Sequence, residues 1–231
     1  MNREYEFSVV VFAKDTAKLY RTFKNIREVT PEGTVQILAV RTAGDMDIPD
    51  ERDMRELEEA GEKEKELKAE ELDKIYGEFN PEDPRFREML ADRDLLYIDG
   101  LECRDLVAEL KEKIAGSYVV FAKAGICFSS KSSAEVRRCF EEENRDVVIT
   151  KIRGKGNIHV REHNNYCNRF TEKTTLDNNV YLLHQLYAAY TFAADQVKWV
   201  SEIRPEIWYL DVMTMVYQSV VSCRSLGVAS G

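Results

Sequence analysis

Three soft metal ligands recur every four residues in the second half of the sequence: His159, His163 and Cys167. On a helix, this spacing would place all three on one face, where they could bind zinc together with a fourth ligand or a water molecule. The surrounding residues 156–160, however, are typical of a strand or a loop, so the spacing no longer brings the side chains together. We therefore expect surface or hydrogen-bonding histidines here rather than a metal site.

Two single residues are candidates for a role in catalysis. Cys127 follows a predicted strand, but no residue near it in the sequence supplies the histidine that would activate a thiol nucleophile. Asp211 stands just before an apolar helix, where aspartate would either cap the helix or serve as a general base or acceptor-binding group. The sequence leaves both roles open for Asp211, and we expect Cys127 to be an ordinary thiol.

Strands and helices alternate along the chain and set the positions of these residues. Short apolar runs rich in β-branched residues are typical of strands buried on both faces, as a parallel sheet requires. Such runs occupy residues 7–12, 35–40, 95–98, 117–122 and 146–150. Apolar stripes predict helices from a cap at Asp15 or Thr16 to Ile26, and at 104–114, 132–143, 177–198 and 207–225. The sequence therefore predicts an α/β protein with a mostly parallel sheet flanked by helices, around a single main core.

Residues 51–77 differ from the rest of the chain in composition. They are mostly acidic and basic, and four acidic residues each precede a basic residue by four positions, the order that supports a helix. We expect a solvated helix packed along one narrow edge, with a partner-docking arm as the alternative. The domain is accordingly predicted to span residues 1–231, with residues 51–80 as a charged helical insertion.

The composition excludes several classes of protein. A net charge of −9 and a pI near 5.1 argue against a nucleic-acid scaffold, because binding phosphates needs basic patches. No apolar run reaches the roughly 18–20 residues that span a bilayer, and the N-terminus lacks the pattern of a signal peptide. The five cysteines form no C-x-x-C pair, which fits reduced thiols. We therefore expect a cytoplasmic protein with no transmembrane segment and no nucleic-acid partner.

An open parallel sheet binds its ligand beyond the carboxyl ends of its strands, so the loops that follow the predicted strands are informative. These loops are 12–16, 41–47, 99–103 and 122–130. None contains the G-x-x-x-x-G-K-[ST] phosphate loop, and no G-x-G-x-x-G motif follows a strand. The sequence therefore lacks the motifs that would indicate an ATPase or a dinucleotide-dependent oxidoreductase.

The order of segments resembles the family 2 glycosyltransferases, whose GT-A fold transfers a sugar from a nucleotide donor. The resemblance covers residues 6–228 and rests on matching hydrophobic positions more than on identical polar residues. Ser8–Asp15 stands where the family opens with S-V-V-I-P-x-Y-N. Val40–Asp45 stands where the family has V-D-D-G-S-x-D, a loop that holds the base and the ribose.

The second half of the chain continues this resemblance. Gly116–Phe121 and Asp146–Ile149 frame the place of the family's D-x-D motif and of the strand that follows it. Trp208–Asp211 and the apolar helix after it resemble the family's E-D-x-x-F helix, whose aspartate is often the base in inverting members. Trp208 and Tyr209 would either stack on a sugar ring or pack in the core.

The resemblance implies a site and partners. Asp211 would be the catalytic base, and the nucleotide-binding residues would be Lys14, Asp15, Arg41, Asp45 and Lys123. The implied partners are a nucleotide-sugar donor and a glycan acceptor in surface polysaccharide synthesis. A homo-oligomer and a larger biosynthetic complex both stay open as the assembly.

The departures from the family pattern divide the functional hypothesis in two. The family's D-x-D motif chelates a divalent metal, but the aligned residues here are Lys123-Ala124-Gly125, so we expect no metal cofactor. Arg41 likewise replaces the nucleotide-binding acid. The first hypothesis is a metal-independent glycosyltransferase in which Lys123 and Arg41 neutralise the donor's diphosphate. The alternative is a catalytically inactive glycosyltransferase-like module that acts in binding or assembly.

Overall fold

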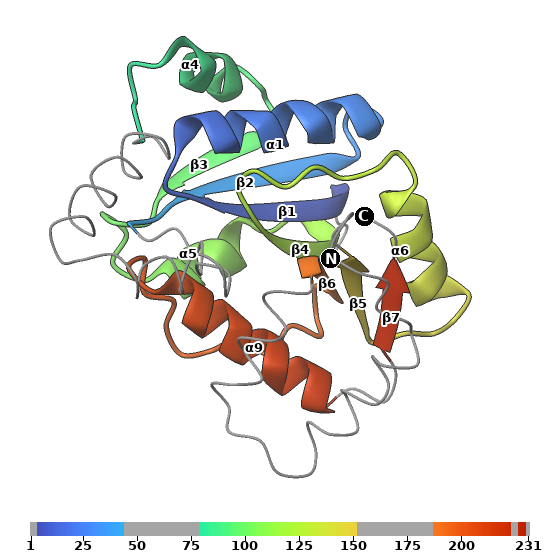
Figure 1. Cartoon of the computed structure of the whole chain (residues 1–231). Coiled ribbons are helices and arrows are strands. Elements are labelled where there is room, and N and C mark those ends of the chain that lie inside the picture. The colour runs from blue at the N-terminus through green and yellow to red at the C-terminus, as the bar shows by residue number, and fades with distance from the viewer. Residues whose placement is uncertain (1–3, 44–78, 152–186, 223–225, 230–231) are drawn as a thin grey trace, which may run out of the picture.

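A computed structural model of the chain describes residues 4–43, 79–151, 187–222 and 226–229 (Figure 1). Within these residues, seven strands form one sheet in the order β3-β2-β1-β4-β6-β5-β7. The strands are β1 (Tyr5–Ala13), β2 (Val35–Arg41), β3 (Leu95–Asp99), β4 (Gly116–Lys123), β5 (Val147–Lys151), β6 (Tyr187–Ala193) and β7 (Leu226–Ala229). The helices are α1 (Thr16–Val29), α4 (Pro84–Leu90), α5 (Leu106–Lys113), α6 (Ser132–Glu141) and α9 (Trp208–Ser222).

The sheet is mostly parallel, as predicted. Strand β6 runs antiparallel to both of its neighbours, β4 and β5, whereas the other described pairs are parallel. The first βαβ unit follows from its sequence, because β1 and β2 are apolar runs with their middle residues buried, as strands covered on both faces require. Of the two predicted caps for α1, the structure uses Asp15, whose carboxylate accepts a hydrogen bond from the Lys18 amide at 2.9 Å.

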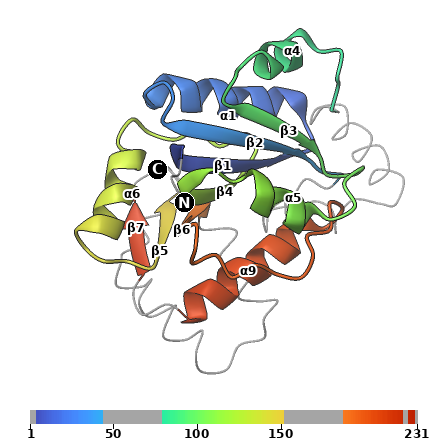
Figure 2. The same ribbon diagram turned by 180° about the vertical axis from the view of Figure 1, so that it is seen from behind.

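Helices cover the sheet on both sides and give three layers (Figures 1 and 2). Helices α1, α4 and α6 pack on one side, which we call the α1 face, and α5 and α9 pack on the other, the α9 face. Because side chains alternate along a strand, Val11 of β1 belongs to the α1 face and Phe12 to the α9 face. The core of this single domain is thus divided by its own sheet into two clusters, one on each face.

Residues 187–193 form strand β6, so the helix predicted at 177–198 is wrong for this part of its range. Tyr190 and Phe192 pack in the α9-face cluster, whereas Ala189 packs in the α1-face cluster. This period of two belongs to a strand, and pairing with β4 and β5 overrides the helical preference of the alanines. Residues 177–186 lie outside the described residues.

The other predicted elements that fall on described residues are confirmed with slightly shifted ends. Helix α4 and strand β7 were not predicted; α4 begins at Pro84 after the N-cap Asp83. The charged segment 51–77 and the three candidate zinc ligands, His159, His163 and Cys167, lie outside the described residues. In the part of the chain that is described, no helix has the length and hydropathy needed to cross a membrane.

Candidate active site

The carboxyl ends of strands β1 to β4 meet at one edge of the sheet, which we call the carboxyl edge. In sheet order, the polar residues at these ends are Asp99 of β3, Arg41 of β2, Lys14 after β1 and Lys123 of β4. The Ala43 amide donates a hydrogen bond to the Pro205 carbonyl at 3.2 Å, which brings the segment before α9 to the same edge. Ligands of open parallel sheets bind at this position, so the carboxyl edge is the candidate active site.

Arg41 is held by a neighbouring carboxylate. It lies opposite Asp99 in the β2–β3 register, and its Nη1 donates to Asp99 Oδ2 at 2.9 Å. This hydrogen bond raises the pKa of Arg41. With 32% of the Arg41 side chain and 27% of the Asp99 side chain exposed, a ligand can reach the pair. Arg41 is therefore an accessible cation whose charge Asp99 balances in part.

An aromatic wall stands beside this ion pair. The Arg41 guanidinium lies over the Phe79 ring, 5.2 Å from its centroid, and Phe79 stacks on Tyr97. The Tyr97 hydroxyl donates to Asp99 at 3.4 Å, and burial, followed by the Asp99 charge, raises the pKa of Tyr97, so the phenol keeps its proton. Gly100 permits this arrangement, because a Cβ there would lie 2.5 Å from the Arg41 carbonyl oxygen.

Lys123 is the last residue of β4, and its side chain lies on the α9 face of the sheet. It pairs with Phe12 and continues the alternation of Phe121, and both aromatic residues pack on the α9 face. Arg41 instead continues the alternation of Ala39 on the α1 face. Strand β1 separates β2 from β4, so the two cations start roughly 10 Å apart in the plane of the sheet. The structure thus brings Arg41 and Lys123 to one edge but points them to opposite faces.

The segment after Lys123 folds back along α1. Gly125 reverses the chain with a φ of +94°, and its amide donates to Thr22 Oγ1 at 2.9 Å. The Asn25 side-chain amide donates to the Phe128 carbonyl at 3.1 Å and accepts from the Phe128 amide at 2.5 Å. These contacts fix the direction in which the chain leaves the end of β4.

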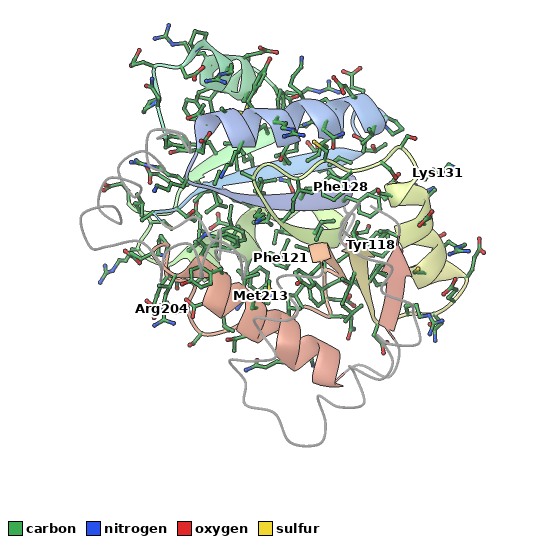
Figure 3. All side chains as sticks on the ribbon, in the orientation of Figure 1. Tyr118, Phe121, Phe128, Lys131, Arg204 and Met213 are labelled. Atoms are coloured by element: carbon green, nitrogen blue, oxygen red, sulfur yellow. The ribbon has the colours of Figure 1, made fainter. Side chains whose placement is uncertain are left out.

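Asp211 lies in the first turn of α9 and binds Arg204, which Figure 3 shows at the N-terminal end of that helix. Arg204 donates from Nη2 at 2.6 Å, from Nε at 3.0 Å and from its backbone amide at 2.9 Å, so both carboxylate oxygens accept. This contact raises the pKa of Arg204. Because the helix already begins at Trp208, the alternative role of Asp211 as N-cap is wrong, and its role as a base stays a prediction.

Trp208 belongs to the core. Its ring stacks on Phe12 at 4.4 Å with 11° between the planes, and 3% of the residue is exposed. Of the two predicted roles of this tryptophan, the structure shows core packing rather than an exposed sugar platform. The stack also anchors the start of α9 on the end of β1.

The other predicted site residues differ in how they are placed. Lys14 is half-buried directly after β1. Asp15 is 5% exposed, and its carboxylate caps α1. Asp45 lies outside the described residues. Cys127 is exposed in the segment that runs along α1.

Sequence reasoning missed Asp99, Tyr97, Phe79 and Arg204. Loop 99–103 had been singled out as a strand end, and its first residue, Asp99, would have been found by asking which polar side chain follows the apolar run. Nothing comparable marks Phe79, because its position depends on how the chain returns to the sheet before α4.

The described residues at the carboxyl edge do not fit a divalent metal. Residues 123–125 supply a lysine, an alanine and a glycine, whereas magnesium and manganese need oxygen ligands. Two described acids at this edge already have partners, since Asp15 caps α1 and Asp99 binds Arg41. Among the described residues, no three His, Cys, Asp or Glu side chains are grouped so as to hold a metal ion.

No protein-family model and no curated protein sequence matches the chain. Solved structures do match it in fold. TarS 1-349 of S. aureus superposes with a TM-score of 0.51 at 13% identity, over 96% of this chain and 57% of that one. The mannosyltransferase PcManGT of Pyrobaculum calidifontis, in complex with GDP-Man and Mn2+, gives 0.52 at 12% identity, over 98% and 56%. Glucosyl-3-phosphoglycerate synthase of M. tuberculosis gives 0.51 at 12% identity, over 98% and 71%.

The chain has a GT-A-like fold. This confirms the predicted fold class, and the resemblance to nucleotide-sugar transferases holds at the level of the fold. The chain spans little more than half the length of TarS 1-349 and of the mannosyltransferase. Identities of 12–13% show a shared fold and leave the chemistry to be argued from the site.

Proposed function

We propose that the chain is a nucleotide-sugar-dependent glycosyltransferase domain in which Lys123 neutralises the donor's diphosphate in place of a metal ion. The observation that carries this proposal is the position of Lys123, which ends β4 at the carboxyl edge and follows the alternation of the α9 face. Asp211 belongs to α9, the helix that covers this face. A cation for the leaving group and a carboxylate for the attacking hydroxyl thus lie on the same side of the sheet.

The nucleoside part of the donor would lie toward β2 and β3. Arg41 and Asp99 offer hydrogen bonds of both kinds there, and the half-buried Phe79 and Tyr97 offer apolar contact beside them. The roughly 10 Å from β2 to β4 suits a ligand whose base and diphosphate stand at opposite ends. The nucleotide would therefore cross the end of β1, next to Lys14.

Replacing Lys123 with alanine tests the proposal. We expect Lys123→Ala to weaken binding of a nucleoside diphosphate by about tenfold or more, the effect of losing one charge-assisted contact in a partly buried site. Calorimetric titration with UDP, GDP, CDP and dTDP measures this effect. Affinity should be unchanged when manganese replaces a chelator in the buffer.

Lys24→Ala is the matched control. Lys24 is an exposed lysine of α1 paired with Glu88, and its loss should leave nucleotide affinity unchanged. Equal affinities of wild type and Lys123→Ala, or binding that requires manganese, would contradict the role given to Lys123.

The second candidate function is a glycosyltransferase-like module without turnover that acts in binding or assembly. The observation in its favour is that Arg204 binds both carboxylate oxygens of Asp211. A catalytic base needs one of these oxygens to accept the proton of the acceptor's hydroxyl. Nucleoside diphosphate release from a panel of nucleotide sugars separates the two functions, since a module of this kind releases none.

The proposal also extends to the acceptor and to the cellular location of the reaction. The family resemblance supports a glycan acceptor in surface polysaccharide synthesis, carried out on the cytoplasmic side where nucleotide sugars are made. The resemblance also supports an assembly with other biosynthetic proteins or with further copies of this chain.

A further inference from the structure

Away from the carboxyl edge, the α1 face is hollowed. A half-open cavity of about 50 Å³ is bounded by the sheet, by α1, by α6 and by residues 128–129. Its floor includes Phe7 and Val35, which are near the amino ends of β1 and β2. Phe128 and Lys131 lie on the segment that connects β4 with α6 (Figure 3), and Phe128 and Ser129 form part of the wall.

The lining combines apolar side chains with hydroxyl groups, and none of the described lining residues is charged. Three of the six lining hydroxyls bond within the protein. Thr30 donates to the Ile26 carbonyl at 2.6 Å, and Ser129 and Ser132 share a hydrogen bond at 3.1 Å.

Thr191 differs from these three. It is 0% exposed, and its Oγ1 is the one buried side-chain oxygen or nitrogen of the described residues that has no hydrogen-bond partner. Its register neighbours in β4 and β5 are Val120 and Val148, whose side chains offer it none. A buried hydroxyl without a partner is costly, so a ligand that supplies one gains affinity at this position.

We propose that this cavity binds a small uncharged molecule that has one hydrogen-bonding oxygen on a short apolar body, such as an alcohol or a ketone. The oxygen would meet Thr191 on the sheet, and the apolar body would contact the valine and phenylalanine side chains of the lining. An ion is disfavoured because the described lining carries no opposite charge. The cavity is about a third of the size of an engineered 150 Å³ cavity that holds benzene, so the part of the ligand inside must be smaller than that ring.

The same observations favour an alcohol or a ketone over water as the ligand of the cavity. A buried water molecule needs two to four polar partners, whereas the hydroxyls of Thr30, Ser129 and Ser132 already bond within the protein. A molecule that satisfies Thr191 and fills the apolar remainder uses the cavity better than water does.

Amide NMR titration of the full chain with 2-propanol, acetone and acetate tests the proposal. The neutral probes should cause saturable shifts at Thr191, Val120 and Phe128, and acetate should cause none. Thr191→Val should weaken neutral-probe binding by about tenfold, the effect of one lost hydrogen bond at a buried position. Thr30→Val, which removes a hydroxyl that is satisfied within α1, should bind as wild type does.

Two further measurements keep the test decisive. Val136→Ile adds a methyl group from α6 into the cavity and should reduce neutral-probe binding even if Thr191→Val is poorly folded. Without probe, Thr191→Val should melt at a higher temperature than wild type, because the unpartnered hydroxyl is gone. Non-saturable shifts, equal affinity of Thr191→Val and wild type, acetate binding, or a lower melting temperature of Thr191→Val would each overturn the proposal.

Discussion

Replacing Gly116 with alanine is expected to destabilise the fold by about 3 kcal/mol, at the upper end of the usual cost of overpacking a core. A Cβ at this position would lie 2.3 Å from the Ser8 amide nitrogen and 2.6 Å from the Phe7 carbonyl carbon. Both atoms belong to the backbone of β1, so no side chain can rotate away to make room. Strands β1 and β4 would have to separate where they are paired.

The same separation would break a buried polar network. The Gly116 amide donates to Ser8 Oγ at 2.7 Å, and Ser8 Oγ donates to Gln36 Oε1 at 2.5 Å. Gln36 also accepts from the Ala115 amide at 3.0 Å and donates to the Lys113 carbonyl at 2.9 Å. These groups are buried or nearly so, and each one left without a partner adds to the loss.

Urea denaturation of Gly116→Ala measures the effect, and Gly33→Ala is its control. Gly33 has a φ of +74°, but the nearest atom to an added Cβ is the Arg93 guanidinium at 3.9 Å. Gly33→Ala should therefore cost only the backbone strain, about 1 kcal/mol. If both alanine variants lose the same small amount, the close approach of β1 and β4 at Gly116 is not what the structure shows.

Most of the fold could be predicted because the central strands have a clear sequence pattern. Each of β1, β2 and β4 contains an unbroken run of buried apolar residues, which is typical of a sheet covered on both faces. Strand β6 was mistaken for a helix because Tyr187–Ala193 contains alanines beside its aromatic residues and lacks turn residues that would mark it as a strand. Its identity depends on β4 and β5, which pair with it from far away in sequence.

The candidate site could be located from the sequence, but the contacts between its residues could not be predicted. The rule that ligands bind at strand ends located Arg41 and Lys123 correctly at one edge. It could not show that Arg41 meets Asp99, 58 residues away, because that contact depends on β3 lying next to β2. Nor could it separate the faces to which Arg41 and Lys123 point, since the resemblance aligned both with one crevice.

Asp211→Asn is expected to abolish most turnover if the chain is a glycosyltransferase. The asparagine keeps the shape of the side chain but cannot accept a proton from an attacking hydroxyl at a useful rate. General base catalysis contributes about 10²–10⁴-fold to rates of this kind, and we expect nucleoside diphosphate release to fall by a factor in that range. Nucleotide affinity should stay unchanged, because Asp211 acts on the acceptor and Lys123 on the donor.

The chain supplies a closely matched control in Asp83→Asn. Arg85 binds Asp83 at 2.6 Å with 46% and 13% of the two side chains exposed, and Arg204 binds Asp211 at 2.6 Å with 49% and 13% exposed. Asp83 caps α4, on the other side of the sheet from α9, and asparagine caps a helix as well as aspartate does. The two variants should therefore show equal small changes in melting temperature, so only a loss of turnover distinguishes Asp211→Asn. Equal turnover in both variants would remove Asp211 from the mechanism and leave Arg204 and Asp211 as a structural pair that holds the start of α9.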